Sequence, residues 1–119
     1  MPLLRIGQKA SFTKTVTEND VIAFAEASGD KNPVHLDEDF AKKTRFGKRI
    51  VHGILVAGLI SAVLGTQLPM PGTIYLSQEL NLKRPIYIGD IITAHVEVIK
   101  IREGKHIYTL STNCLNQNI

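Results

Sequence analysis

The stretch GILVAGLISAVLG, Gly53 to Gly65, decides how this 119-residue chain folds. From Gly53 to about Leu64 it contains a single polar residue, Ser61, and its apolar residues lie on every side of a helix instead of along one stripe. A helix that is apolar nearly all round is buried over most of its surface. We therefore expect the rest of the chain to wrap around this helix.

After this helix the spacing of apolar residues changes from helical to alternating. In TIYLSQELNL, residues 73–82, the alternation predicts a half-buried strand with Gln78 as the polar exception on its apolar face. The run IITAHVEVIKIRE, 91–103, predicts a long strand whose alternation shifts by one residue at Ile99, as a β-bulge requires. After a turn at EGK, residues 106–115 predict a further strand with a common face of Tyr108, Leu110, Thr112 and Cys114.

The residues before the apolar helix predict a short strand at 12–16 and a helix from about 18 to 27. Thr17 and Asp20 have the spacing of a capping box, and Gly29 ends this helix. A second, shorter helix begins at Asp37, with acidic residues first and basic residues near its end. Together these elements predict an α+β fold in one domain, with an antiparallel sheet curled over the apolar helix.

The net charge, the longest apolar run and the cysteine content limit the kinds of partner and compartment expected for this protein. The net charge of +3 is mildly basic, and without a concentrated basic face it does not indicate a nucleic-acid partner. The longest apolar run is too short to span a bilayer, and the first residues lack the apolar run of a secretory signal, so no membrane association is expected. Cys114 is the only cysteine, which excludes an internal disulfide and favours a buried or half-buried strand residue in a cytoplasmic protein.

Asp30 and His35 are the candidates for acid-base chemistry in SGDKNPVHLD, residues 28–37. Asp30 follows the helix-ending glycine, and His35 follows an Asn-Pro pair that imposes an extended or turn geometry. A carboxylate beside an imidazole on so stiff a connector can move a proton through a bound water. The alternative is that both residues serve only the turn and the surface.

Gly53, at the start of the apolar helix, adds a second feature. The first amides of a helix have no intrahelical partner, and glycine lets a ligand approach them closely. A carbonyl oxygen that gains charge would be stabilised there, as in an oxyanion hole. An acid-base pair near such a site indicates addition or removal of water, enolisation, or thioester hydrolysis beside a carbonyl.

These motifs carry a resemblance to a known family. SGDKNPVHLD, followed by FGKRIVHGILVAGLIS and GTIYLSQELNLKRPIYIGD, resembles the (R)-specific enoyl-CoA hydratase group of the MaoC-like, hot dog fold proteins, from about Ile6 to Asn113. The resemblance implies a hot dog fold and the reversible hydration of trans-2-enoyl-CoA to (R)-3-hydroxyacyl-CoA. It implies that Asp30 and His35 are the catalytic pair, that the Gly53 amide binds the thioester carbonyl, and that Ser61 lies near the substrate pocket.

Other residues have weaker assignments. Leu64 and Gln78 are expected to bind substrate beside Ser61, although Gln78 fits a structural tie and Ser61 fits a hydrogen bond to a carbonyl one turn earlier equally well. His52 is a residue that caps or orients the helix start and is assigned no chemistry. The histidines lack metal-ligand spacing, so we expect no metal, and no cofactor besides the coenzyme A thioester that serves as substrate. The basic run KKTRFGKR, 42–49, is a solvated face or a contact for coenzyme A phosphates.

The chain departs from the family at its end. The family continues past Cys114 into one more strand that closes the sheet, whereas this sequence stops at NQNI. We expect one domain over residues 1–119 that lacks that strand, with its edge left open or covered by a partner chain. The resemblance also implies a homodimer or higher homo-oligomer with the ligand site at the subunit interface. Rival functions are a 3-hydroxyacyl-ACP dehydratase and a noncatalytic acyl-thioester-binding subunit of a hetero-oligomer.

Overall fold

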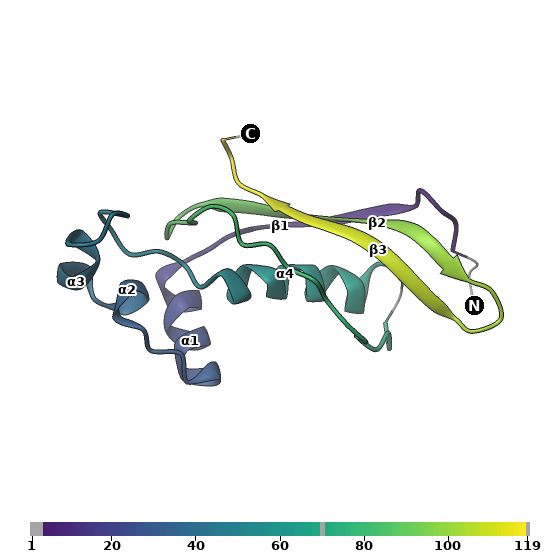
Figure 1. The fold of residues 1–119 in the computed structure, drawn as a ribbon, viewed down its shortest axis with the longest axis horizontal. Helices are drawn as coiled ribbons and strands as arrows, with labels where there is room; N and C mark the ends of the chain where they lie inside the picture. Colours follow the sequence, from purple (N-terminus) through teal and green to yellow (C-terminus); the bar gives the residue numbers. More distant parts are fainter. Residues whose placement is uncertain (1–3, 70, 119) are drawn as a thin grey trace.

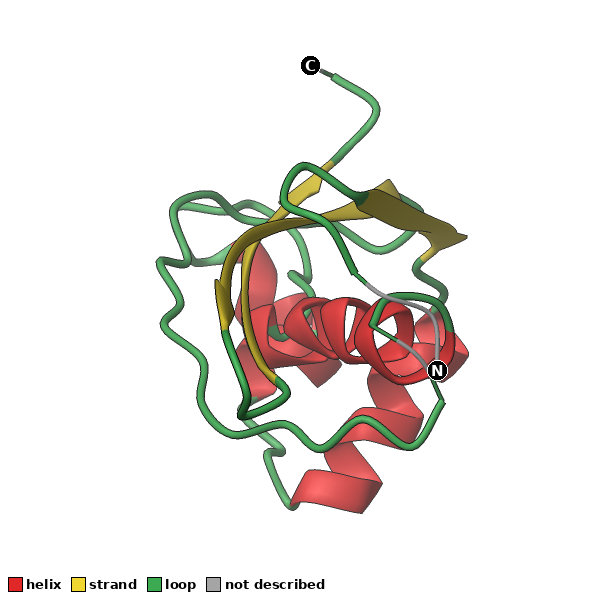
Figure 2. Ribbon diagram, turned by 90° about the vertical axis from the view of Figure 1, so that its right-hand side faces the viewer, coloured by secondary structure: helices red, strands yellow, loops and turns green. Residues whose placement is uncertain are grey.

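The structure, a computed structural model, describes residues 4–69 and 71–118. Strands β1 (Lys9–Thr15), β2 (Ile91–Arg102) and β3 (Ile107–Leu115) form an antiparallel sheet in the order β1-β2-β3. Between β1 and β2 the chain forms four helices, α1 (Glu18–Ser28), α2 (Pro33–Leu36), α3 (Glu38–Lys42) and α4 (Gly53–Thr66). The sheet curls over α4, and the three short helices gather at one end of it (Figures 1 and 2). This arrangement confirms the predicted α+β class.

The core forms where α4 meets the concave face of the sheet. The buried residues of α4 are Val56, Leu59, Ile60 and Val63. The alternating residues Ile92, Ala94, Val96 and Val98 of β2 are buried opposite them, as the period-two pattern predicted. The expected wrapping of α4 is only partial, because Ile54, Gly58 and Ser61 form an exposed stripe along it.

The predicted irregularity in the long strand is confirmed. Val98 pairs with Leu110 and Lys100 pairs with Thr109, so Ile99 is the extra residue of a β-bulge. Beyond the bulge, β3 shows the expected alternation: Tyr108, Leu110, Thr112 and Cys114 are all half-buried, and the residues between them are exposed.

The helices at the start of the chain follow their local signals. Thr17 and Asp20 form the capping box of α1, and Gly29 ends it with a φ of 80°. Asp37 caps α3, which begins one residue later at Glu38. The four-residue helix α2 was not predicted, because one turn of helix is too short to show a helical period.

The prediction of a strand at 73–82 is wrong. The residues that should form its buried face are largely exposed: 77% for Ile74, 73% for Leu76 and 62% for Leu82. No ladder joins this segment to a named strand in the described part of the chain. Alternation indicates which face of a segment is apolar, whereas a strand also requires a neighbouring edge to pair with.

Within the described residues, no helix has the length and the apolar character needed to cross a membrane.

Candidate active site

Asp30 lies in the connector between α1 and α2, which is held by short-range hydrogen bonds. Its amide donates to Ser28 Oγ at 3.0 Å, and its Oδ1 accepts from the Asn32 amide at 3.2 Å. Asn32 Oδ1 in turn accepts from the Val34 amide and caps α2. Because these bonds are local, the sequence SGDKNPV itself shapes the connector. The side chain of Asp30 is 50% exposed, so its carboxylate remains open to a ligand.

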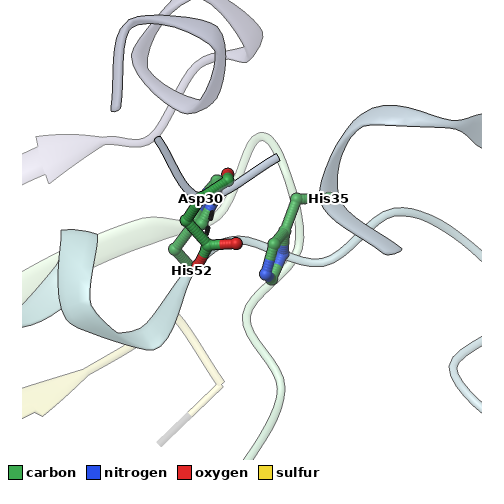
Figure 3. A group of neighbouring side chains, drawn as sticks. All are labelled: Asp30, His35 and His52. Carbon is green, nitrogen blue, oxygen red and sulfur yellow. Dashed lines mark hydrogen bonds and ion pairs between the residues drawn. The ribbon is translucent and has the colours of Figure 1, made fainter. Parts of the chain in front are cut away.

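His35 is buried on α2 and has a defined tautomer. Its Nδ1 lies 2.8 Å from the backbone oxygen of Ile50. A carbonyl only accepts, so Nδ1 carries the proton and Nε2 keeps a lone pair. His35 therefore has a ring nitrogen free to take a proton. One oxygen of Asp30 points toward this ring (Figure 3).

The four residues that lead into α4, 49–52, bind back onto the connector 30–35; we call them the approach segment. The Ile50 amide donates to the oxygen of Val34 at 3.2 Å, and Arg49 Nε donates to the oxygen of His35 at 2.8 Å. Arg49 also pairs with Glu18 on α1 at 2.6 Å. The approach segment thus holds the start of α4 beside the acid and the imidazole.

His52 is a member of this site that sequence reasoning missed. It is 2% exposed, its Nε2 lies 3.0 Å from the backbone oxygen of Asp30, and its ring stacks on His35 with centroids 3.8 Å apart. His52 is the N-cap residue of α4, but its side chain makes no capping hydrogen bond to that helix. His52 lies 22 residues after Asp30 in the sequence, so no short motif connects the two residues. The only local signal was its position immediately before Gly53.

Gly53 begins α4, as predicted, and its amide has no acceptor within the part of the chain that the structure describes. A side chain at this position would collide with a neighbour, since a Cβ on Gly53 would lie 2.8 Å from Leu82 Cδ1. Leu82 is 62% exposed, so the methyl groups that would collide lie at the end of a largely exposed side chain. The geometry therefore retains an unpaired backbone donor beside Asp30 and His35.

The three residues expected to bind substrate line one groove. Ser61, Leu64 and Gln78 face a cavity of about 1070 Å³ between α4, the segment 71–81 and β3. Gln78 Nε2 donates to Thr112 Oγ1 at 3.3 Å, and the Tyr75 hydroxyl donates to Gln78 Oε1. Burial raises the pKa of Tyr75, with a smaller contribution from Cys114, so this hydroxyl keeps its proton at neutral pH. Ser61 makes no bond to a carbonyl one turn earlier in the described residues.

The structure therefore brings the predicted site residues together in two groups. Asp30, His35 and Gly53 lie at the start of α4, whereas Ser61 and Leu64 lie further along it, beginning about 12 Å away at 1.5 Å of rise per residue. None of the first group lines the groove.

The stacked imidazoles do not suit a shared metal ion. The potential ligand atoms of Asp30, His35 and His52 all lie within 4.8 Å of one another. A metal, however, must lie near the plane of each imidazole that binds it. The two rings are stacked, with centroids 3.8 Å apart and planes inclined by 29°, so their nitrogen lone pairs lie in nearly parallel planes and do not converge on one ion.

The basic run divides into free and engaged residues. Lys42, Lys43, Arg45 and Lys48 are exposed, with Arg45 over the ring of Phe46 and Lys48 over the ring of Tyr87. Arg49 is instead held by Glu18 and the backbone of His35, its side chain only 13% exposed. Arg49 is therefore a structural residue, and the residues of this run that remain available to bind phosphates are the exposed Lys42, Lys43, Arg45 and Lys48.

Comparison with known proteins shows the family of the chain. The family model described as a MaoC like domain matches residues 4–117. The chain belongs to the MaoC-like family. Among curated proteins, this MaoC-like chain is 50% identical over 114 residues to the (R)-specific enoyl-CoA hydratase of Aeromonas caviae, covering 96% of this chain and 85% of that protein. It is 48% identical over 111 residues to the 3-hydroxybutyryl-CoA dehydratase of Methylorubrum extorquens, covering 93% of this chain and 71% of that protein.

A solved structure extends the likeness of this MaoC-like chain to three dimensions. The structure described as an (R)-hydratase from A. caviae involved in PHA biosynthesis superimposes with a TM-score of 0.93 at 50% identity, covering 96% of this chain and 86% of that one. The sheet that curls over α4 is accordingly the hot dog fold, which confirms the expected architecture. In this MaoC-like domain the acid, the imidazole and the helix start meet at the N-terminal end of the wrapped helix.

Proposed function

We propose that this chain is an (R)-specific enoyl-CoA hydratase, which adds water reversibly across the double bond of a trans-2-enoyl-CoA. The observation that carries the proposal is the closeness of Asp30 and His35 to His52, the residue immediately before the unpaired amide of Gly53 at the start of α4. The curated relatives at 48% and 50% identity act, by their names, on coenzyme A thioesters. That similarity favours coenzyme A over a carrier protein as the acyl carrier.

The geometry supports a mechanism in which the residues share the proton transfers. A water held between Asp30 and His35 attacks C3, and one of its protons passes to the pair, where His35 Nε2 has the free lone pair. The C2–C3 π electrons shift toward the thioester, whose oxygen gains charge against the Gly53 amide. The pair returns one proton to C2, so that the site ends in its starting protonation state. Since both groups lie on one side of the bound thioester, water adds to one face.

The groove beside α4 is the proposed acyl-binding site. Its lining combines the apolar Leu64 with hydroxyl and amide groups of Ser61 and Gln78. A thioester at Gly53 would direct its acyl chain along α4 toward these residues, about 12 Å away. The depth of this path would set the preferred chain length.

We also propose that the chain functions as a homodimer or higher homo-oligomer. Ile54, Ile74, Leu76 and Leu82 are 55–77% exposed on α4 and the neighbouring segment. Contiguous exposed apolar residues of this kind are typical of a protein interface. Light scattering on the purified chain tests this: a monomer at micromolar concentration would contradict it.

We propose a cytoplasmic enzyme that needs no cofactor. Hydration transfers no electrons, so acid, base and backbone donor are sufficient for the chemistry. The half-buried thiol of Cys114 has no disulfide partner in this single-cysteine chain, which fits a reducing compartment.

The test is hydration of crotonyl-CoA, followed by loss of the enoyl absorbance. We expect Asp30→Asn and His35→Ala each to lower kcat about 100-fold or more, on the scale of general acid-base catalysis. His95→Ala, at an exposed histidine of β2, is the control and should leave the rate unchanged. Full activity in either site variant would remove that residue from the mechanism. Thioester binding without turnover in the unmodified chain would instead support a noncatalytic subunit.

A further inference from the structure

We propose that His52 is a positioning residue of this site: a buried imidazole that sets the orientation of both Asp30 and His35. This role rests on the proposed function, because it concerns the same two proton-transferring groups. His52 is 2% exposed, so it does not contact substrate directly. It acts through the groups that it touches.

The first contact is with the backbone of Asp30. His52 Nε2 lies 3.0 Å from the Asp30 carbonyl oxygen, and 4.0 Å from the carboxylate Oδ2. A carbonyl only accepts, so Nε2 carries the proton and donates it. This bond joins the connector to the residue immediately before α4. It therefore fixes the direction in which the Asp30 side chain leaves the backbone, relative to the amide of Gly53.

The second contact is with the ring of His35. The two imidazoles stack with centroids 3.8 Å apart and planes inclined by 29°. His35 is thus held at its edge by the oxygen of Ile50 and on its face by His52. Phe24 packs against His52 at 4.8 Å between centroids, so the supporting ring is itself held by α1. A ring restrained on edge and face cannot turn its Nε2 away from the bound water.

The remaining nitrogen of His52 makes no competing contact. Nδ1 is buried and has no hydrogen-bond partner in the residues that the structure describes. The orientation of the ring is therefore set by the Nε2 bond to Asp30 and by the two rings packed against it, His35 and Phe24.

Two variants separate the two contacts. His52→Gln retains a side-chain N–H that can reach the Asp30 carbonyl but loses the stacked ring, whereas His52→Phe retains an aromatic face but loses the donor. For each variant that folds, we expect kcat for crotonyl-CoA to fall by about 10-fold to 100-fold, the scale of a small misplacement of catalytic groups. KM should change by less than about threefold, because His52 does not touch substrate. His95→Gln is the matched control.

Unchanged kcat in both folded variants, or a loss confined to KM, would overturn the inference. Nitrogen NMR of ¹⁵N-histidine-labelled wild-type protein provides a test that needs neither variant. We expect the Nε2 of His52 to carry the proton that it donates to the Asp30 carbonyl. A His52 whose Nε2 carries no proton would overturn the inference even if both variants failed to fold. Failure of the proposed function has a different signature, namely wild-type protein that turns over no enoyl-CoA while its His52 spectrum is as expected.

Discussion

Replacing Gly53 by alanine tests whether the start of α4 is reserved for a ligand or only for a neighbouring side chain. The added Cβ would lie 2.8 Å from Leu82 Cδ1 and 3.3 Å from Cδ2. Both are closer than ordinary carbon contacts of about 3.5–4.0 Å, so something must move. Leu82 is 62% exposed, and its terminal methyl groups can turn into solvent.

The expected effect on stability is small. Leu82 has only part of its side chain buried, so turning it outward should cost about 1 kcal/mol or less. Replacing glycine by alanine in a helix contributes up to about 1 kcal/mol in the opposite direction. We therefore expect the free energy of unfolding of Gly53→Ala to lie within about 1 kcal/mol of the wild-type value. Urea denaturation followed by circular dichroism measures it.

The expected effect on activity is much larger. A methyl group at the helix start would crowd the approach of a thioester oxygen to the Gly53 amide, and loss of one such donor costs about 100-fold to 1000-fold in kcat. Since the amide itself remains in Gly53→Ala, we expect a loss of at least about 10-fold in kcat/KM for crotonyl-CoA. The double variant Gly53→Ala, Leu82→Ala removes the collision but retains the methyl group. Recovery of wild-type activity in the double variant would show that Gly53 serves only to accommodate Leu82.

Three further predictions concern pH, reactivity and substrate length. The hydrogen bond from the Thr17 amide lowers the pKa of the Asp20 carboxyl, and Lys14 lowers it further. The stability that this carboxylate contributes is therefore present above the unfolded-state pKa near 3.8 and is lost as the pH falls through the lower folded-state pKa. Asp20→Asn should lower the free energy of unfolding at pH 7 by about 1 kcal/mol and flatten this acid-side loss in denaturant titrations, and equal slopes would contradict the assignment. Burial raises the pKa of the Cys114 thiol, so its reaction with a disulfide reagent at pH 8 should be at least about 10-fold slower in the folded chain than in urea, and equal rates would refute the burial. Leu64→Ala enlarges the groove, so kcat/KM for octenoyl-CoA should rise relative to that for crotonyl-CoA by about 4-fold or more, which corresponds to the free energy of burying one methylene. An unchanged ratio would place the acyl chain elsewhere.

The parts of the fold that sequence predicted correctly are those specified by neighbouring residues. The capping box of Thr17 and Asp20, the left-handed Gly29 and the buried alternation of β2 each depend on side chains within a few positions. The bulge at Ile99 was predictable for the same reason, since a shift in the alternation must appear in the sequence itself. Local chemistry was sufficient for these features.

The segment 73–82 was predicted wrongly because its conformation depends on what lies beside it. Its alternation of apolar and polar residues is real, but Ile74 and Leu76 remain exposed without a paired strand in the described chain. Strand preference measures how well a side chain fits a paired, half-buried surface, and a single sequence does not supply the partner. The same segment nevertheless supplies Gln78 to the groove, as expected.

The group of Asp30, His35 and His52, proposed as the active site, was only partly predictable from the sequence, and the approach segment shows why. Asp30 and His35 share one connector, so their closeness follows from local turns, whereas His52 arrives from a different part of the chain. It reaches them because the approach segment forms four hydrogen bonds with residues 30–35, through Arg49 Nε, Ile50 N, Ile50 O and His52 Nε2. Each of these four bonds uses a backbone atom of the approach segment or of the connector at fixed register, so a shift by one residue would break them together. The connector and the helix start are therefore one structural unit, and the orientation of the acid, of the imidazole and of the Gly53 amide is determined jointly by that unit.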